Sequence, residues 1–217
     1  MELFVVSLLG GLLALDGTAV GQFMFSRPLV AGALTGWILG DPATGFAVGA
    51  LLEVYLLVSF PSGGARYPEG ATAAVVAVAS AAGVSTLGAL PLGVAVGLVW
   101  GQVGGFTVSA LRRLNGRLVP EPDGPHPERV STAHVGAIAM DGLRGGILTL
   151  VGALSGRWVV ALLARDWPLG PSDTRGLLLV GGAVSAGVLM RSLGGYRRMR
   201  LLFVAGMALA LVGARLL

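Results

Sequence analysis

Long apolar stretches, separated by short polar segments, dominate this chain. Residues 71–90, 92–111 and 145–164 are each close to the roughly 20 apolar residues that a helix needs to cross a bilayer. Residues 176–190 and 201–217 are shorter but still apolar enough to be spans. The pattern predicts an all-α, polytopic membrane protein that forms a single membrane domain.

The N-terminal third is patterned differently, because its apolar pieces are short. The stretch at 3–15 ends at Asp16, and the stretch at 28–39 ends at a Gly-Asp-Pro turn. In transporters, short segments interrupted by Gly and Pro point to the binding site, and broken backbone at membrane depth needs protein or water around it. We therefore expect broken or re-entrant helices and the substrate site within residues 1–70. The alternative is ordinary spans that end in tight turns.

Glycine recurs every four residues in the second long stretch, at Gly93, Gly97, Gly101 and Gly105. This spacing gives a helix face without side chains, on which a second helix can pack closely. We expect residues 71–111 to form Gly-rich spans that pack through this face.

Arginine supplies every basic residue and is concentrated between the apolar stretches. Residues 112–131 hold four arginines and three acids, and residues 191–200 hold four arginines and no acid. Residues 165–175 balance two arginines against two acids. Because cytoplasmic loops are enriched in Arg and Lys, the first two segments are predicted to be cytoplasmic loops and the third to lie outside. The C-terminal spans occupy residues 132–217.

Composition excludes several classes of protein. The chain is 54% hydrophobic and 12% charged, whereas soluble domains are about 25% charged. It has no cysteine and two histidines, so neither a disulfide framework nor a Cys or His metal centre is expected. The net charge of +4 reflects orientation in the membrane and not a surface for nucleic acid. No P-loop, dinucleotide fingerprint or catalytic triad is present, which favours a transporter subunit without a cofactor over an enzyme.

Glu53 is the clearest candidate for a substrate contact. It lies within an apolar run, where an ionised side chain costs about 2.5–3.5 kcal/mol on insertion scales. Its carboxylate could accept hydrogen bonds from sugar hydroxyls, or it could form a buried ion pair with Arg27. The other candidates are polar groups that suit a neutral polyol: Gln22, Arg27, Arg66, Glu69 and Gln102. Gln102 could instead bond across helices.

Four further polar residues are expected to be mainly structural. Asp141 and Arg144 are three positions apart, so they can pair on one face of a helix. His134 lies near the start of the same span, where a capping or hydrogen-bonding role is the usual one, and Asp41 lies at the break after residues 28–39.

Several short motifs resemble a known family. The run Ser26-Arg27-Pro28-Leu29, followed by Leu39-Gly40-Asp41 and Leu52-Glu53, is similar to the IIC membrane subunits of mannose-type (mannose–fructose–sorbose) sugar phosphotransferase systems. Weaker similarities to the same family are Pro68-Glu69, Gly101-Gln102, His134-Val135 and Arg144.

The resemblance implies a function and partners. A IIC subunit pairs with a IID subunit in the inner or plasma membrane, and the pair is expected to form a homo-oligomer. A hexose-like sugar crosses and is phosphorylated by a cytoplasmic IIB protein that is charged through IIA, so the phosphoryl chemistry resides on IIB. Two alternatives remain: a scaffold or regulator that kept the fold without transport, and a substrate-binding membrane subunit of another importer.

Overall fold

The computed structural model describes residues 1–59, 66–118 and 128–216, and in those ranges the regular elements are α-helices. This confirms the predicted all-α class. Glu128 and residues 209–216 are described as backbone alone. The helices are α1 (Glu2–Thr18), α2 (Pro28–Ile38), α3 (Pro42–Tyr55), α4 (Gly70–Ala81), α5 (Ala89–Leu118), α6 (Glu128–Leu163), α7 (Pro171–Ser192) and α8 (Tyr196–Leu216).

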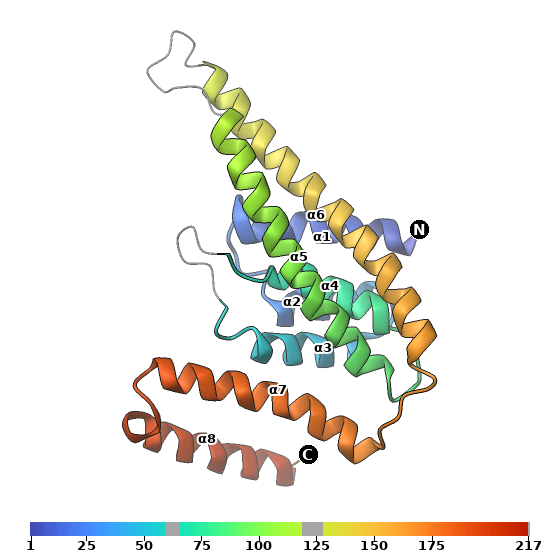
Figure 1. Cartoon of the computed structure of the whole chain (residues 1–217), viewed down its shortest axis with the longest axis vertical. Helices are drawn as coiled ribbons and strands as arrows, with labels where there is room; N and C mark the ends of the chain where they lie inside the picture. Colours follow the sequence, from blue (N-terminus) through green and yellow to red (C-terminus); the bar gives the residue numbers. More distant parts are fainter. Residues whose placement is uncertain (60–65, 119–127, 217) are drawn as a thin grey trace.

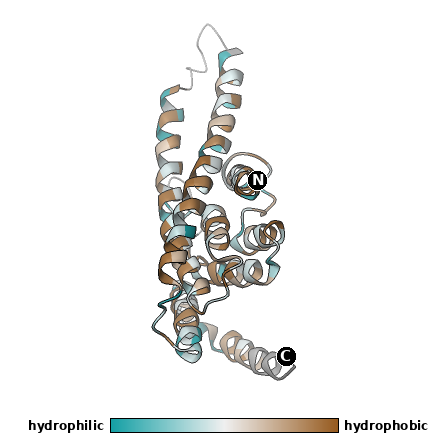
Figure 2. Cartoon of the chain, turned by 90° about the vertical axis from the view of Figure 1, so that its right-hand side faces the viewer, coloured by the Kyte–Doolittle hydropathy of each residue, from teal (hydrophilic) through white to brown (hydrophobic). Residues whose placement is uncertain are grey.

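Helices α5 and α6 form a long antiparallel pair that α1 and α4 cross (Figure 1). Within the described ranges, α5, α6 and α7 are long and apolar enough to cross a membrane. Hydrophobic residues are spread along both long helices, α5 and α6 (Figure 2). At 1.5 Å per residue, the 30 residues of α5 reach about 45 Å, which exceeds a hydrocarbon core of about 30 Å.

The segment predicted as a loop at 112–131 is helical at both ends, since α5 continues through Leu118 and α6 begins at Glu128. The density of charges in this segment suggested a loop. Charged residues are excluded from the lipid core but not from helices, and Arg and Leu are strong helix formers. Residues 119–127 lie outside the described residues. The cytoplasmic side of this segment stays a prediction.

The expected span at 71–90 is wrong. Helix α4 ends at Ala81, and a turn with Gly83 at φ +76° precedes the start of α5 at Ala89. All residues of α4 from Ala71 to Ala81 are buried. The apolar sequence of this short helix therefore reflects burial among other helices and not exposure to lipid.

Helices α2 and α3 form a tight hairpin, as expected for a broken N-terminal third. Their 11 and 14 residues give lengths of about 16 and 21 Å, too short to cross alone. Four glycines let the backbones touch: a Cβ on Gly32 would lie 2.7 Å from the Gly45 carbonyl oxygen, and one on Gly36 would lie 2.6 Å from the Gly45 Cα. Gly49 meets the backbone of Leu29 in the same way.

Asp41, which was expected to be mainly structural, joins this hairpin to the end of α4. It is the N-cap of α3, and one carboxylate oxygen accepts from the Thr44 N–H at 3.1 Å. The second oxygen accepts from the Gly83 N–H, also at 3.1 Å, in the turn that follows α4. One side chain therefore satisfies a free N–H at the start of α3 and fixes the end of α4 beside it.

The glycine face of α5 packs against α4, which confirms the prediction made from its spacing. A Cβ on Gly97 would lie 2.6 Å from the Ala73 carbonyl oxygen and 2.7 Å from the Ala77 Cβ. Gly93 meets Ala77 and Ala81 in the same way. Helices α1 and α6 also cross at glycines, because a Cβ on Gly11 would lie 2.7 Å from the Gly142 carbonyl oxygen.

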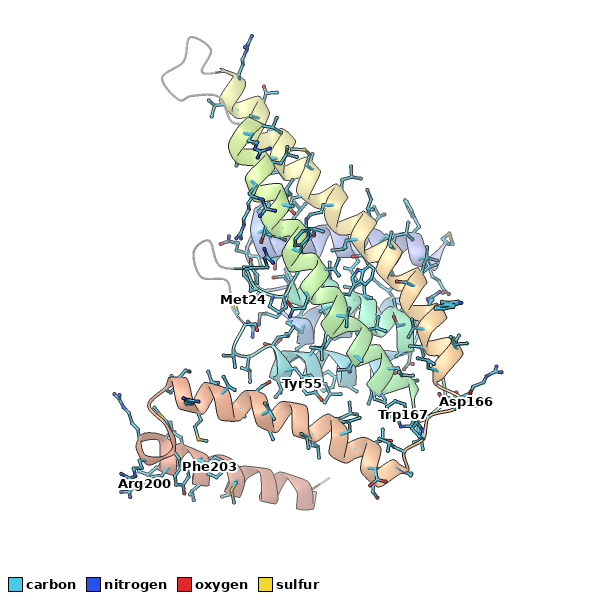
Figure 3. All side chains as sticks on the ribbon, viewed as in Figure 1. Met24, Tyr55, Asp166, Trp167, Arg200 and Phe203 are labelled. Carbon is cyan, nitrogen blue, oxygen red and sulfur yellow. The ribbon has the colours of Figure 1, made fainter. Side chains whose placement is uncertain are left out.

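Helix α7 lies below α3 in Figure 1 and is attached to it through Tyr55 (Figure 3). The Tyr55 hydroxyl donates to the Leu178 carbonyl, and the Ser185 hydroxyl donates to the Tyr55 carbonyl at 3.0 Å. Trp167 in the preceding connection donates to the Thr174 hydroxyl at 2.8 Å. These bonds set α7 against the end of α3.

The orientation can be tested with single cysteines, because the chain has none of its own. Ser172→Cys should react with a membrane-impermeant thiol reagent in intact cells. Ser131→Cys should react only after the membrane is permeabilised. Reaction at position 131 but not at 172 in intact cells would reverse the assignment.

The packing of α4 on α5 can be tested with a matched pair of glycine substitutions. Gly97→Ala should lower the melting temperature in detergent, because the new Cβ meets the backbone of Ala73. Gly116→Ala, also in α5, adds its Cβ where no atom lies within 4 Å. It should be neutral or stabilising, since Ala favours a helix by about 1 kcal/mol over Gly. Equal melting temperatures for the two variants would contradict this packing.

Candidate functional site

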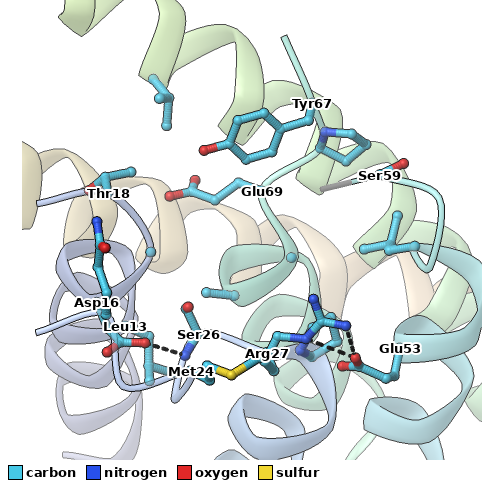
Figure 4. Close-up of a pocket in the computed structure, with 18 of the residues that line it drawn as sticks. Leu13, Asp16, Thr18, Met24, Ser26, Arg27, Glu53, Ser59, Tyr67 and Glu69 are labelled. Atoms are coloured by element: carbon cyan, nitrogen blue, oxygen red, sulfur yellow. Dashed lines mark hydrogen bonds and ion pairs between the residues drawn. The ribbon is translucent and has the colours of Figure 1, made fainter. Parts of the chain in front are cut away.

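A cavity of about 450 Å³ opens between the end of α1, the α1–α2 loop, the end of α3, the start of α4 and α5 (Figure 4). Ligand pockets in proteins commonly have volumes of about 300–1,000 Å³. Polar and charged groups from separate segments face the cavity, among them Asp16, Ser26, Arg27, Glu53, Tyr67 and Glu69. Gln22 also lines it. The predicted residues Gln22, Arg27, Glu53 and Glu69 are thus brought together.

The α1–α2 loop is shaped by Asp16, which the sequence analysis did not select. Its carboxylate accepts from the Phe23 N–H at 2.7 Å and from the Ser26 N–H at 2.8 Å. On either side of Phe23, Gln22 and Met24 take left-handed backbone conformations, with φ of 54° and 68°. Such conformations cost of order 1–3 kcal/mol each and persist where surrounding structure imposes them. An acid that ends an apolar run is the signal that could have identified this residue.

Arg27 and Glu53 form an ion pair on one wall of the cavity (Figure 4). Arg27 Nε donates to Glu53 Oε1 at 2.8 Å, Arg27 Nη2 donates to the same oxygen, and the Leu29 N–H donates to Oε2 at 3.2 Å. The side chains are 38% and 22% exposed. The ion pair considered as the structural role of Glu53 is therefore present. The carboxylate also faces the cavity, which leaves room for a ligand contact.

Glu69 belongs to a second, more deeply buried network. Arg144 on α6 holds it through two bonds, Nη2 to Oε1 at 2.7 Å and Nη1 to Oε2 at 3.0 Å. Thr72 donates to Oε2 at 2.9 Å. The side chains of Arg144 and Glu69 are 11% and 8% exposed. This bidentate arrangement fixes the direction of the Glu69 carboxylate at the cavity wall.

Asp141 completes this network, and its predicted pairing with Arg144 is confirmed. Arg144 Nε donates to Asp141 Oδ1 at 2.9 Å, and Nη1 also donates to the Thr107 hydroxyl at 3.0 Å. The Thr18 hydroxyl, at the end of α1, donates to Asp141 Oδ2. The Arg144 guanidinium thus joins the start of α4 to α5 and α6, and Asp141 adds α1 through Thr18.

Three predicted candidates lie outside this cavity. Gln102 is exposed, because it follows Gly101 and is turned about 100° from the face that packs on α4. Arg66 is also exposed, with its guanidinium 5.4 Å from the centre of the Phe106 ring. His134 is exposed and lines a second cavity.

Sequence reasoning missed two further groups in the cavity wall, Tyr67 and Arg112. The Arg112 guanidinium lies 5.8 Å from the centre of the Tyr67 ring, and its Nη2 is 3.4 Å from the Tyr67 hydroxyl. Aromatic rings and guanidinium groups attract one another at this distance. Tyr67 directly precedes the Pro68-Glu69 motif, and its aromatic character beside that motif was the available signal.

The buried network can be tested with paired substitutions. Removing one partner of a buried ion pair costs about 3–5 kcal/mol, because the other charge is left uncompensated. Glu69→Gln and Arg144→Gln should therefore each destabilise the folded protein strongly, and the double variant should be less destabilised than the sum. The more exposed Arg27–Glu53 pair is the control and should show a smaller coupling energy. An equal or larger coupling there would contradict the assigned burial.

Comparison with known proteins supplies the family. The family model described as "PTS system sorbose-specific iic component" matches residues 1–214. The mannose-specific EIIC component of the PTS from Escherichia coli strain K12 is 27% identical over 157 residues, which cover 70% of this chain and 56% of that protein. The sorbose-specific EIIC component of Klebsiella pneumoniae is 28% identical over 191 residues, 85% of this chain and 68% of that protein. The chain thus spans little more than half the length of the mannose-specific relative.

Two solved structures have a similar fold. One, described as "Structure of membrane protein", has a TM-score of 0.72 and 21% identity, and the match covers 99% of this chain and 92% of that one. The other is from a complex of the mannose transporter ManYZ with microcin E492; its TM-score is 0.60 at 20% identity, with 96% and 86% coverage. These likenesses concern the fold. The family match confirms the resemblance noted in the sequence: the chain is an inner-membrane protein and belongs to the sorbose-specific IIC family of the sugar phosphotransferase system.

Proposed function

We propose that this chain is the sugar-translocating IIC subunit of a mannose-type phosphotransferase system, and that the sugar binds in the 450 Å³ cavity. The observation that carries the proposal is the lining of that cavity. Carboxylates, hydroxyls and two guanidinium groups face one space. The carboxylates of Asp16, Glu53 and Glu69 are each positioned by hydrogen bonds or ion pairs to the protein.

This lining suits a neutral polyol. A sugar presents several hydroxyl groups, each of which can donate and accept, so recognition needs acceptors and donors at set directions. Glu53 and Glu69 supply charged acceptors, and Arg27 supplies donors at the start of α2. Ion pairs compensate the charges of both glutamates. The other two charged groups of the lining, Asp16 and Arg112, are opposite in sign, so the site does not require a charged ligand for balance.

The ring of Tyr67 adds an apolar face to this polar lining. One face of a sugar ring carries C–H groups, which pack against an aromatic ring, while its hydroxyls reach polar groups at the edge. Tyr67 and Glu69 lie two positions apart, in the non-helical segment that directly precedes α4. This short segment therefore offers both an apolar and a charged surface to the same ligand.

The partners follow from the family and are part of the proposal. A IID membrane subunit completes the translocation unit, which is a homo-oligomer of IIC–IID pairs, and a cytoplasmic IIB protein, charged through IIA, phosphorylates the hexose-like sugar. Uptake of labelled mannose in cells that express this chain with and without a IID partner tests this assignment. Uptake only with the partner supports it. Absence of uptake with the partner and IIB present would favour a scaffold without transport, and uptake without any phosphotransferase partner would favour a different importer.

Glu53→Gln tests the site itself. The amide keeps the shape of the side chain but replaces a charged acceptor with a weaker one. A hydrogen bond to a charged group contributes about 1.5–3 kcal/mol, so sugar affinity should fall about tenfold or more. Affinity by isothermal titration and membrane yield should be measured on the same preparations.

Gln102→Ala and Arg66→Gln are matched controls, because both positions lie outside the cavity. They should leave sugar affinity as it is in the wild type. A purely structural Glu53 predicts a different pattern for Glu53→Gln: low yield, with normal affinity in the protein that survives. Normal affinity at normal yield would remove Glu53 from the site.

A further inference from the structure

A second cavity adjoins the sugar cavity on the side where α5 and α6 lead to residues 119–127. Its volume is about 280 Å³. Thr18, Val108 and Arg112 line both cavities, so the two spaces share a wall. The arginine-rich segment at this end of α5 and α6 is the one that charge counting predicts to be cytoplasmic. A sugar that leaves the first cavity toward the cytoplasm would meet this second space.

The polar groups of the second cavity differ from those of the first. Arg112 has no carboxylate partner among the described residues. Among the described residues, the side-chain oxygen of Asn115 is buried without a hydrogen-bond partner, and the imidazole of His134 lines the cavity from α6. A cation, an imidazole and a free amide therefore face the same space.

The acid in the second cavity is already compensated. Asp141 lines it, but one carboxylate oxygen accepts from Arg144 and the other from Thr18. The carboxylates of Glu53 and Glu69 in the first cavity are also held by arginines, but three carboxylates line that cavity, of Asp16, Glu53 and Glu69, whereas Asp141 alone lines the second among the described residues. The second lining therefore has fewer carboxylate acceptors than the first, and Arg112 and His134 offer it donors for an anion.

We propose that the second cavity binds a sugar phosphate, with the phosphate against Arg112 and His134 and a sugar hydroxyl against the free oxygen of Asn115. Arg and imidazole donors suit phosphate oxygens, and a buried acceptor without a partner is satisfied by a hydroxyl donor. The inference rests on the proposed function, in which the transported sugar becomes a phosphate ester. Arg112, at the shared wall, contacts ligands in both cavities.

Isothermal titration of the full chain in nanodiscs of zwitterionic lipid tests this site, with mannose 6-phosphate, inorganic phosphate and mannose as separate probes. Mannose 6-phosphate should bind, and Arg112→Gln and His134→Gln should each weaken its binding about tenfold, the effect of losing a hydrogen bond to a charged group. Arg117→Gln is the matched control. It removes the same charge from α5 at an exposed position that lines neither cavity, and it should keep the wild-type affinity.

Several results would overturn the proposal. Undetectable binding of mannose 6-phosphate, or equal weakening by Arg112→Gln, His134→Gln and Arg117→Gln, would remove the site. Inorganic phosphate that binds as tightly as the sugar phosphate would reduce it to an anion site. Loss of mannose 6-phosphate binding when anionic lipid is added to the nanodiscs would assign it to a lipid headgroup. Binding of neutral mannose, and its loss in Glu53→Gln, reports separately on the proposed function.

Discussion

Arg144 binds two carboxylates from different parts of the chain, and the arrangement of four helices depends on these bonds. It joins Asp141 on its own helix to Glu69 at the start of α4, while Thr107 and Thr18 bring in α5 and α1. An uncompensated charge at this depth would cost several kcal/mol. Any movement of the helices that separates these partners is therefore disfavoured. The network thus fixes the part of the cavity wall that carries Glu69.

Close backbone contact is the second constraint. Helices α2, α3 and α4 are too short to cross a membrane singly, so their polar ends must be covered by protein or water. Glycines at the α2–α3 and α4–α5 contacts allow this, because the backbones meet without side chains between them. Arg157 on α6 adds a bond from its Nε to the Ala79 carbonyl at 2.9 Å, which satisfies a free carbonyl at the end of α4. The broken region is therefore enclosed, and its open side forms the 450 Å³ cavity.

Predictions from sequence were most successful where the signal was local. The Gly93–Gly105 spacing predicted a packing face, and the three-residue separation of Asp141 and Arg144 predicted their ion pair. Glu53 was selected because a carboxylate is costly in an apolar run; it lies in the cavity wall and pairs with Arg27, and its contact with a substrate stays a prediction. Each of these inferences depends on helix periodicity or on the properties of one side chain, which the sequence contains directly.

Features that depend on tertiary contacts were missed or misplaced. The apolar run at 71–90 resembles a span, but α4 is buried by protein and ends at Ala81. Gln102 belongs to the Gly101-Gln102 motif and Arg66 lies close to Pro68-Glu69 in the sequence, yet neither residue lines the cavity. Asp16 gains its role from a loop that returns to it after seven and ten residues, and Glu69 gains Arg144 across 75 positions. No pattern along the chain records such partners.

The central claim is that sugar occupies the cavity between the α1–α2 loop and the start of α4. Substrate protection of a single cysteine measures this directly, because the chain has no cysteine of its own. Ser59 lines the cavity, whereas Ser85 is exposed in the turn between α4 and α5 and does not line it. Mannose should slow the reaction of a small methanethiosulfonate reagent with Ser59→Cys and leave the rate at Ser85→Cys unaltered. Equal rates at position 59 with and without mannose, in protein that binds the sugar, would contradict the central claim.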